Sequence, residues 1–308
     1  MEACTAHPRN VAQHKLFCIP GTWEAVTAAE EFGRIEPRTE IGMLTGVTDL
    51  LDRRVFEVVY LNYPSNFGPV AGGGDSLLDT LGRPSYRVAR DLGVSELVRL
   101  IREHRGGFGI LGYGQGAAVA SLVGRELVSG TLRDRMRDCH WLHTFASPHR
   151  GPGHTFPLGN QLAGQGISGD PITDTGTVDW FDYCLPGDVY GDADLADTYL
   201  ARAYELAIEL PLRDPFATIA ECSDSLLRGR LRDVIAELGE EPALVVGKAG
   251  ITAATLATVL QNYPHDKYAV REILPGTSAL RHSANHLNFW GPRVEADEDL
   301  TVTPALRH

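Results

Sequence analysis

The chain contains no stretch of about 18 consecutive apolar residues, so its sequence predicts no transmembrane helix. Residues 1–8 lack the apolar core of a secretory signal, and we therefore expect synthesis in a cytoplasm without a signal peptide. Basic residues are also scarce, since 28 Lys and Arg stand against 40 Asp and Glu. The resulting net charge of -12 argues against a nucleic-acid-binding surface, which needs clustered cations.

Cofactor and metal motifs are equally sparse. The five cysteines form an odd set without a C-x-x-C pair, which favours reduced, buried thiols over a disulfide framework. Residues 107–112 formally match G-x-G-x-x-G, but they lie within an apolar run instead of after it, and no ribose-binding acid follows. His282 and His286 have the i, i+4 spacing of a ligand pair without an evident third ligand. We therefore expect no cofactor and no metal.

The apolar patterning indicates strands that alternate with helices. We expect a mostly parallel, doubly wound α/β sheet, in which active groups gather at the carboxyl ends of the strands. The expected strands cover residues 14–20, 55–61, 107–112, 141–146 and 178–185, and the expected helices cover about 86–104 and 115–128.

The pattern becomes mostly helical after residue 193. We expect an α/β core over residues 14–192, a helical insertion or cap over 193–263, a return to the core over 264–292, and a tail over 293–308. Alternatively, the helices of 193–263 simply cover one face of the sheet.

A glycine-dense turn, Gly112-Tyr113-Gly114-Gln115-Gly116, joins an expected strand to an expected helix. This is the layout of the nucleophile elbow G-x-S-x-G, but Gly114 occupies the serine position. The closest substitute is Ser168 in Gly166-Ile167-Ser168-Gly169-Asp170, which lies in a loop with no following helix. Ser65 and Ser147 lie at strand ends but not on an elbow. The sequence thus has the frame of a serine esterase without its nucleophile.

Acyl transfer by such an enzyme needs a nucleophile, a histidine and a carboxylate, and in enzymes with this elbow the chain order is nucleophile, carboxylate, histidine. Asp188 follows an apolar strand and a Pro-Gly turn, where either a catalytic acid or an Asx turn would stand. Three later histidines compete for the base. We favour His286, which we expect on a late loop followed by aromatic residues that pack on the core, over His265 and His282.

Four segments carry a resemblance to a known family. Residues 112–117 resemble the G-Y-S-Q-G-A elbow of cutinase-like esterases and of mycobacteriophage lysin B enzymes. Residues 20–22, 63–64 and 180–190 are similar to further segments of that family, and the helical stretch looks like the linker insertion of lysin B. The resemblance implies an α/β-hydrolase fold with a helical insertion before the final histidine.

Carried over residue by residue, the resemblance implies Asp188 as the acid and His286 as the base. It implies oxyanion donors at the backbone N–H groups of Gln115 and of Gly21 or Thr22, of which we favour Thr22. The nucleophile falls on Gly114, which has no side chain and cannot form an acyl-enzyme.

Lysin B enzymes cleave the ester between mycolic acids and arabinogalactan, so the resemblance implies a phage protein whose partner is a mycolate-containing envelope ester. Because Gly114 replaces the serine, our first hypothesis is a catalytically inactive module. It would serve in the virion as a minor tail or baseplate protein, with other tail proteins as partners, or bind the bacterial envelope. The alternative is an active serine esterase in the form of a Ser-to-Gly variant.

Overall fold

A parallel sheet forms the centre of the computed structural model, which describes residues 13–24, 42–66, 84–157, 162–193, 204, 208 and 264–294. In these residues five strands pair in the order β2-β1-β3-β4-β5, every pair parallel. The strands are β1 (His14–Ile19), β2 (Phe56–Tyr60), β3 (Phe108–Tyr113), β4 (Cys139–Phe145) and β5 (Asp179–Tyr183). The predicted doubly wound α/β fold is confirmed.

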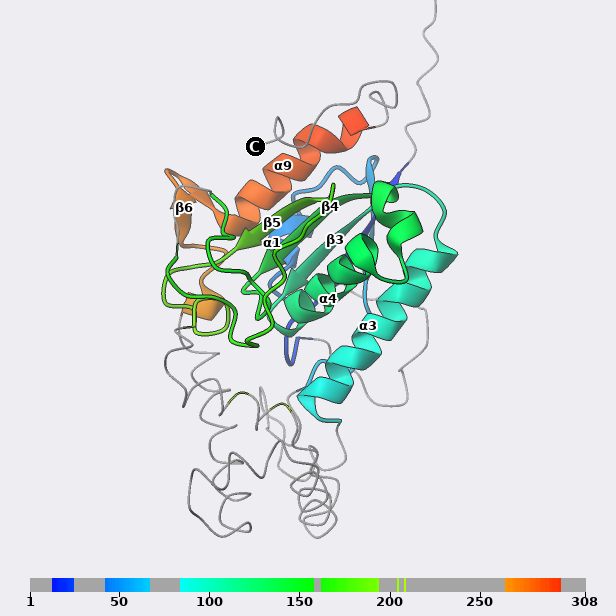
Figure 1. Ribbon diagram of the computed structural model, residues 1–308. Coiled ribbons are helices and arrows are strands. Elements are labelled where there is room, and N and C mark those ends of the chain that lie inside the picture. The colour runs from blue at the N-terminus through cyan, green and yellow to red at the C-terminus, as the bar shows by residue number, and fades with distance from the viewer. Residues whose placement is uncertain are drawn as a thin grey trace, which may run out of the picture.

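Helices cover both faces of this sheet (Figure 1). One face carries α3 (Tyr86–Glu103) and α4 (Gln115–Ser129), and the other carries α1 (Thr45–Thr48) and α9 (Ala279–Val294). The shorter elements are the 3₁₀ turns η2 (Arg133–Asp138) and η3 (Pro264–Asp266) and the antiparallel pair β6 (Glu272–Leu274) and β7 (Thr277–Ser278).

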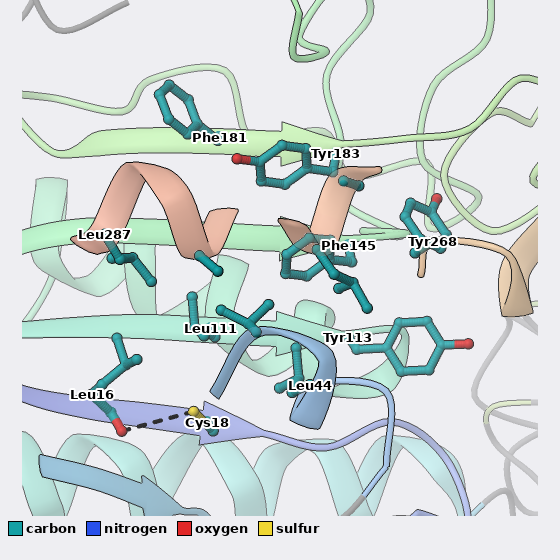
Figure 2. Packing of buried hydrophobic residues seen from close by; sticks show 14 of the residues in the cluster. Leu16, Cys18, Leu44, Leu111, Tyr113, Phe145, Phe181, Tyr183, Tyr268 and Leu287 are labelled. Atoms are coloured by element: carbon teal, nitrogen blue, oxygen red, sulfur yellow. Dashed lines mark hydrogen bonds between the residues drawn. The ribbon is translucent and has the colours of Figure 1, made fainter. Parts of the chain in front are cut away.

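The central strand β3 shows how the sequence fills both cores. Its side chains alternate, so Phe108 and Ile110 pack with residues of α3 and α4, and Leu111 and Tyr113 pack with residues of α1 and α9. Figure 2 shows Leu111 and Tyr113 on this second face, the face that also carries Leu287 of α9. All six residues of β3 are buried, as a strand covered on both faces requires.

The helix α9 corrects a sequence-based expectation. We expected His282 and His286 on a late loop, but both lie within Ala279–Val294. The buried residues of this helix recur three and four positions apart on one face: Ala279, Leu280, Ser283, Ala284, His286, Leu287 and Gly291. The polar residues between them and Pro292 near the end obscured that period in the sequence.

The predicted helical insertion lies almost wholly outside the described residues, as does the tail beyond residue 294, so both boundaries stay predictions. From that stretch the structure describes Tyr204 and Ile208, which pack with Tyr86 and Tyr190. No described helix is long and apolar enough to cross a membrane.

Three cysteines, Cys18, Cys139 and Cys184, are buried free thiols. Cys4 and Cys222 lie outside the described residues.

Candidate active site

The turn at Gly114 joins β3 directly to α4. Gly114 has φ +55° and ψ −113°, a backbone conformation that L side chains rarely adopt. Its N–H donates to the Phe145 carbonyl at 2.9 Å, which fixes the turn against the end of the neighbouring strand β4. This strand, strained turn and helix have the geometry that a nucleophile elbow requires.

The two flanking glycines are needed for packing. A Cβ on Gly116 would collide with the Ile19 carbonyl at the end of β1, and a Cβ on Gly112 would lie 2.5 Å from the Gly116 carbonyl oxygen. Both positions therefore let α4 approach the sheet closely. Gly114 differs, because a Cβ there would meet only the His265 ring among the described residues.

His265 and Asp188 form the histidine–carboxylate pair of the candidate site. The Nδ1 atom of His265 lies 3.2 Å from each carboxylate oxygen of Asp188. On the other side of the ring, Nε2 lies 3.1 Å from the position of a Cβ on Gly114, and Cε1 lies 3.5 Å from it. The three positions therefore stand in the order acid, histidine, nucleophile site, as a catalytic triad requires.

Asp188 is buried and held by three donors. Besides His265, the Tyr268 hydroxyl donates to Oδ2 at 2.6 Å and the Tyr190 N–H donates to Oδ1 at 3.0 Å. Burial alone raises the pKa of Asp188, but His265 and these donors outweigh burial and hold the pKa below its ordinary value. Asp188 is thus kept ionised and oriented toward Nδ1 of His265.

Aromatic rings fix the position of His265. The Tyr113 hydroxyl donates to the His265 carbonyl at 2.8 Å, and the two ring centroids are 5.0 Å apart. Tyr190 meets the imidazole edge at 5.4 Å between centroids. Figure 2 shows Tyr113 and Tyr268 together at the carboxyl ends of the strands. Since the imidazole is 14% exposed, one edge still faces outward.

His286, the favoured base, lies at the other end of the sheet. Its Nε2 is 3.3 Å from Oδ2 of Asp179, the first residue of β5. Asp188 lies beyond the opposite end of that strand, which is Tyr183. The strand alone separates the two ends by about 13 Å. The structure thus places His265, and not His286, beside Asp188.

His286 belongs to a buried group between α9 and the sheet, together with His143 and His282. The Nδ1 atom of His143 is 2.8 Å from the Ser283 hydroxyl, and Nδ1 of His282 is 2.9 Å from the Tyr183 hydroxyl. Burial lowers the pKa of His282 to about 4. In the part of the chain that the structure describes, no three His, Cys, Asp or Glu residues are arranged to hold a metal ion.

The expected oxyanion donors lie beside the elbow. Gln115 is the first residue of α4, where a backbone N–H has no partner within its helix. The residues just before Thr22 pack against that helix end: the Ile19 and Pro20 carbonyls lie beside Gly116, and Gly21 lies against the Tyr113 ring. Within the described residues neither the Gln115 nor the Thr22 N–H has a hydrogen-bond acceptor.

The remaining candidate donor, the Gly21 N–H, is already hydrogen-bonded to Glu24. One carboxylate oxygen accepts from the Gly21 N–H at 2.7 Å, and the other accepts from the Met43 N–H at 2.7 Å. Burial raises the pKa of Glu24, although both donors oppose the rise. The Gly21 N–H is therefore engaged, so Thr22 stays the candidate donor on this side. No sequence motif marks Glu24 or Tyr268, so sequence reasoning missed both.

Ser168, the substitute considered from the sequence, has a histidine neighbour that cannot activate it. The Nδ1 atom of His149 lies 3.2 Å from the Ser168 hydroxyl and 2.8 Å from the Asp170 carbonyl oxygen. A carbonyl oxygen only accepts, so Nδ1 carries the proton and cannot take one from Ser168. Burial also lowers the pKa of His149 to about 4.

Comparison with solved structures identifies a similar fold. The crystal structure of lysin B from mycobacteriophage D29 has a TM-score of 0.55 at 18% identity, over 90% of this chain and 99% of that one. A cutinase-like protein from Cryptococcus sp. has a TM-score of 0.41 at 16% identity, over 61% of this chain and 82% of that one. No protein-family model and no curated protein matches the chain. The chain therefore has the α/β-hydrolase fold that lysin B also has.

Proposed function

We propose that the protein is an esterase-type module that binds an ester group at Gly114 without forming an acyl-enzyme. The observation that carries the proposal is the position of His265, whose Nε2 faces the side-chain position of Gly114 while Nδ1 faces Asp188. A strained elbow, an oriented histidine and free N–H donors are the parts that recognise an ester in a serine hydrolase. Only the nucleophilic oxygen is missing.

The residues take these roles in the proposal. Asp188 orients His265, His265 replaces His286 as the histidine of the site, and the Gln115 and Thr22 N–H groups receive the ester carbonyl oxygen. Gly114 prevents the covalent step, because no atom extends from its Cα toward the ester carbon.

The ligand that we propose is a mycolate-containing ester of the bacterial envelope. The motif resemblance to lysin B and the fold shared with the mycobacteriophage D29 protein support it. We propose that the module acts in a phage tail or at the bacterial envelope, where binding without cleavage would attach the particle to the cell. Detection of the chain in purified virions by mass spectrometry would support the tail location, and its absence there would oppose it.

A second candidate is an active serine esterase represented by its Ser-to-Gly variant. The surroundings of Gly114 favour it, since a side chain there would meet the His265 ring, with Nε2 at 3.1 Å, and no backbone atom of the described residues. Both candidates predict an assembled site. They differ in whether the natural gene encodes glycine, which sequencing of that gene decides.

The test compares the unmodified protein with Gly114→Ser on p-nitrophenyl butyrate. We expect the variant to release p-nitrophenol faster by about 10³-fold, since a restored nucleophile recovers most of what a triad loses. Gly114→Ala is the matched control, because it has the same backbone strain and lacks the hydroxyl. Inactivity of Gly114→Ser in a folded protein would show that the site is not assembled. Equal activity in all three would place the nucleophile elsewhere.

A further inference from the structure

A small buried cluster lies next to several parts of the candidate site. It consists of Tyr86, Ile167, Tyr190, Ala193, Tyr204 and Ile208, with the half-buried Trp23 and Val189 packed against it. Tyr204 and Ile208 belong to the stretch 194–263, of which the structure describes no other residue. A part of the chain that is distant from the sheet in sequence therefore contributes buried side chains beside the site.

On the oxyanion side, the cluster meets both candidate donors. Trp23 directly follows Thr22 in the chain. The Tyr86 carbonyl accepts from Nε2 of Gln115 at 3.3 Å, which ties the Gln115 side chain to the start of α3. The cluster is thus joined to Thr22 by the chain and to Gln115 by a hydrogen bond.

On the acid side, Tyr190 makes the connection. Its N–H donates to Oδ1 of Asp188 at 3.0 Å, and its ring meets the His265 imidazole with 5.4 Å between centroids. The Tyr190 carbonyl accepts from the Ile167 N–H at 3.0 Å, so its backbone is held from both sides. A shift of Tyr190 would therefore move a donor of Asp188 and a ring against His265 together.

The Tyr190 ring is held in turn by two other tyrosines. The Tyr204 ring lies edge-on to Tyr190 at 5.9 Å and to Tyr86 at 6.1 Å between centroids, and all three side chains are fully buried. The Tyr190 hydroxyl donates to the Tyr86 hydroxyl. Edge-to-face contacts of this kind set the orientation of the rings as well as their separation. Burial raises the pKa of all three hydroxyls, so the group stays uncharged at neutral pH.

We propose that Tyr204 is a positioning residue, whose ring holds Tyr190 in the orientation that keeps the Asp188 carboxylate on Nδ1 of His265. Buried groups are close-packed, so loss of the Tyr204 ring leaves Tyr190 without a wall on one side and lets it move. The inference deepens the proposed function and rests on it, since it assigns His265 and Asp188 the same roles.

The first measurement uses Gly114→Ser as the parent, because its turnover of p-nitrophenyl butyrate reports the geometry of the site. Tyr204→Ala should lower kcat by about 10²-fold, the effect of a displacement of about 1 Å at a catalytic group, and should change KM much less. Tyr204→Leu fills more of the volume and should lose part of that rate while it stays folded. Tyr204→Phe keeps the ring and should keep kcat.

Phe108→Leu is the matched control for a loss of stability alone. Phe108 is also a fully buried aromatic residue, but it is the first residue of β3, about 17 Å along the strand from Tyr113 at the other end. Phe108→Leu should lower the urea midpoint about as much as Tyr204→Leu does and leave kcat unchanged. Equal loss of kcat in both would show that loosening of the core, and not the Tyr204 ring, sets the rate.

The second measurement needs no ester and no serine. A carboxylate only accepts, so Nδ1 of His265 carries the proton while Asp188 faces it. Long-range proton–nitrogen correlations of the imidazole in mildly alkaline buffer report which ring nitrogen is protonated, and His265→Ala assigns the signal. We expect the Nδ1–H tautomer in the otherwise unmodified protein and in Tyr204→Phe, and a mixture of tautomers in Tyr204→Ala and Tyr204→Leu.

The outcomes separate this inference from the proposed function. With an active Gly114→Ser parent, a folded Tyr204→Leu protein that keeps either its kcat or its His265 tautomer would overturn the inference and leave the proposed function standing. With an inactive Gly114→Ser parent the proposed function falls, and the tautomer then decides the inference by itself. A shift to mixed tautomers in Tyr204→Leu would support it, and an unchanged tautomer would overturn it.

Discussion

The Nε2 atom of His265 lies 3.1 Å from the point at which a Cβ on Gly114 would stand. The two residues are 151 positions apart along the chain, yet the fold places the histidine where a serine nucleophile would need its base. The ring's other nitrogen faces the buried carboxylate of Asp188. Gly114, His265 and Asp188 therefore stand in the order of a nucleophile position, a histidine and an acid, which supports the proposed function.

The first prediction distinguishes the histidines. In the Gly114→Ser protein, His265→Ala should lower kcat on p-nitrophenyl butyrate by about 10²–10⁴-fold, because it removes the base. His286→Ala should leave kcat nearly unchanged and lower the free energy of unfolding by about 1–3 kcal/mol, since Asp179 loses the nearby imidazole and the buried ring no longer packs against Phe181. Initial rates and urea denaturation measure the two effects. A large loss of kcat in His286→Ala but not in His265→Ala would show that His286 is the base, as the sequence predicted.

The second prediction concerns Tyr268, which donates to Asp188 at 2.6 Å. Tyr268→Phe should lower the free energy of unfolding at pH 7 by about 1.5–3 kcal/mol, the contribution of a hydrogen bond to a charged group. Because the folded-state pKa of Asp188 is below its unfolded value, this stabilisation is present above pH ~4 and is lost as the pH falls through the folded-state pKa.

Urea denaturation at several pH values checks this dependence, and the two proteins should converge in acid. Tyr113→Phe is the control, since its hydroxyl donates to an uncharged carbonyl and should contribute only about 1 kcal/mol. A gap between Tyr268→Phe and the unmodified protein that is constant with pH would oppose the assignment.

The third prediction follows from His149, whose pKa burial lowers to about 4. The unfolded histidine takes up a proton near pH 6.5 and the folded one does not, so stability should fall as the pH drops from about 6.5 to 4. His149 alone should contribute a slope of up to ~1.4 kcal/mol per pH unit. In His149→Asn, which keeps a donor for the Asp170 carbonyl, the slope should flatten. Parallel curves for the two proteins would contradict this account.

The fourth prediction concerns Arg150, a fully buried guanidinium. It donates to the Gly191 carbonyl at 2.6 Å and to the Thr155 hydroxyl at 2.8 Å, and the Gly191 N–H donates in turn to the Asp188 carbonyl. Arg150→Met should lower the free energy of unfolding by at least about 3 kcal/mol, because several buried acceptors lose their donor.

In the Gly114→Ser background Arg150→Met should also lower kcat more than it changes KM, since the loop that carries Asp188 loosens. Arg125→Met removes only an exposed pair with Asp170 and should change stability by less than about 1 kcal/mol. Equal effects of the two substitutions would show that Arg150 does not support the site.

The sequence predicted the parts of the fold that depend on local pattern. Glycine spacing located the elbow at Gly114, and an apolar strand with a Pro-Gly turn located Asp188, because both follow from the geometry of a strand end. The choice among His265, His282 and His286 could not be made from local pattern. It depends on where the chain returns to the sheet after residues 193–263, and no local period encodes that return.

Tyr268 and Glu24 illustrate the same limit. Each acts through a partner far along the chain or across a turn, and neither belongs to a motif. The helix α9 was missed for a local reason, since polar residues interrupt its apolar stripe. The hydrogen bonds of Tyr268 and Glu24 could therefore be found only in the structure.

The most direct test of the central claim is the covalent reaction of the site with diethyl p-nitrophenyl phosphate, followed by intact-mass spectrometry. In Gly114→Ser we expect one diethylphosphoryl group on the introduced hydroxyl, formed rapidly and slowed by at least about 10²-fold when His265→Ala is added. The unmodified protein should remain unlabelled. A folded Gly114→Ser protein that stays unlabelled, or an unmodified protein that takes up the group, would contradict the claim that Gly114 stands in an otherwise assembled esterase site.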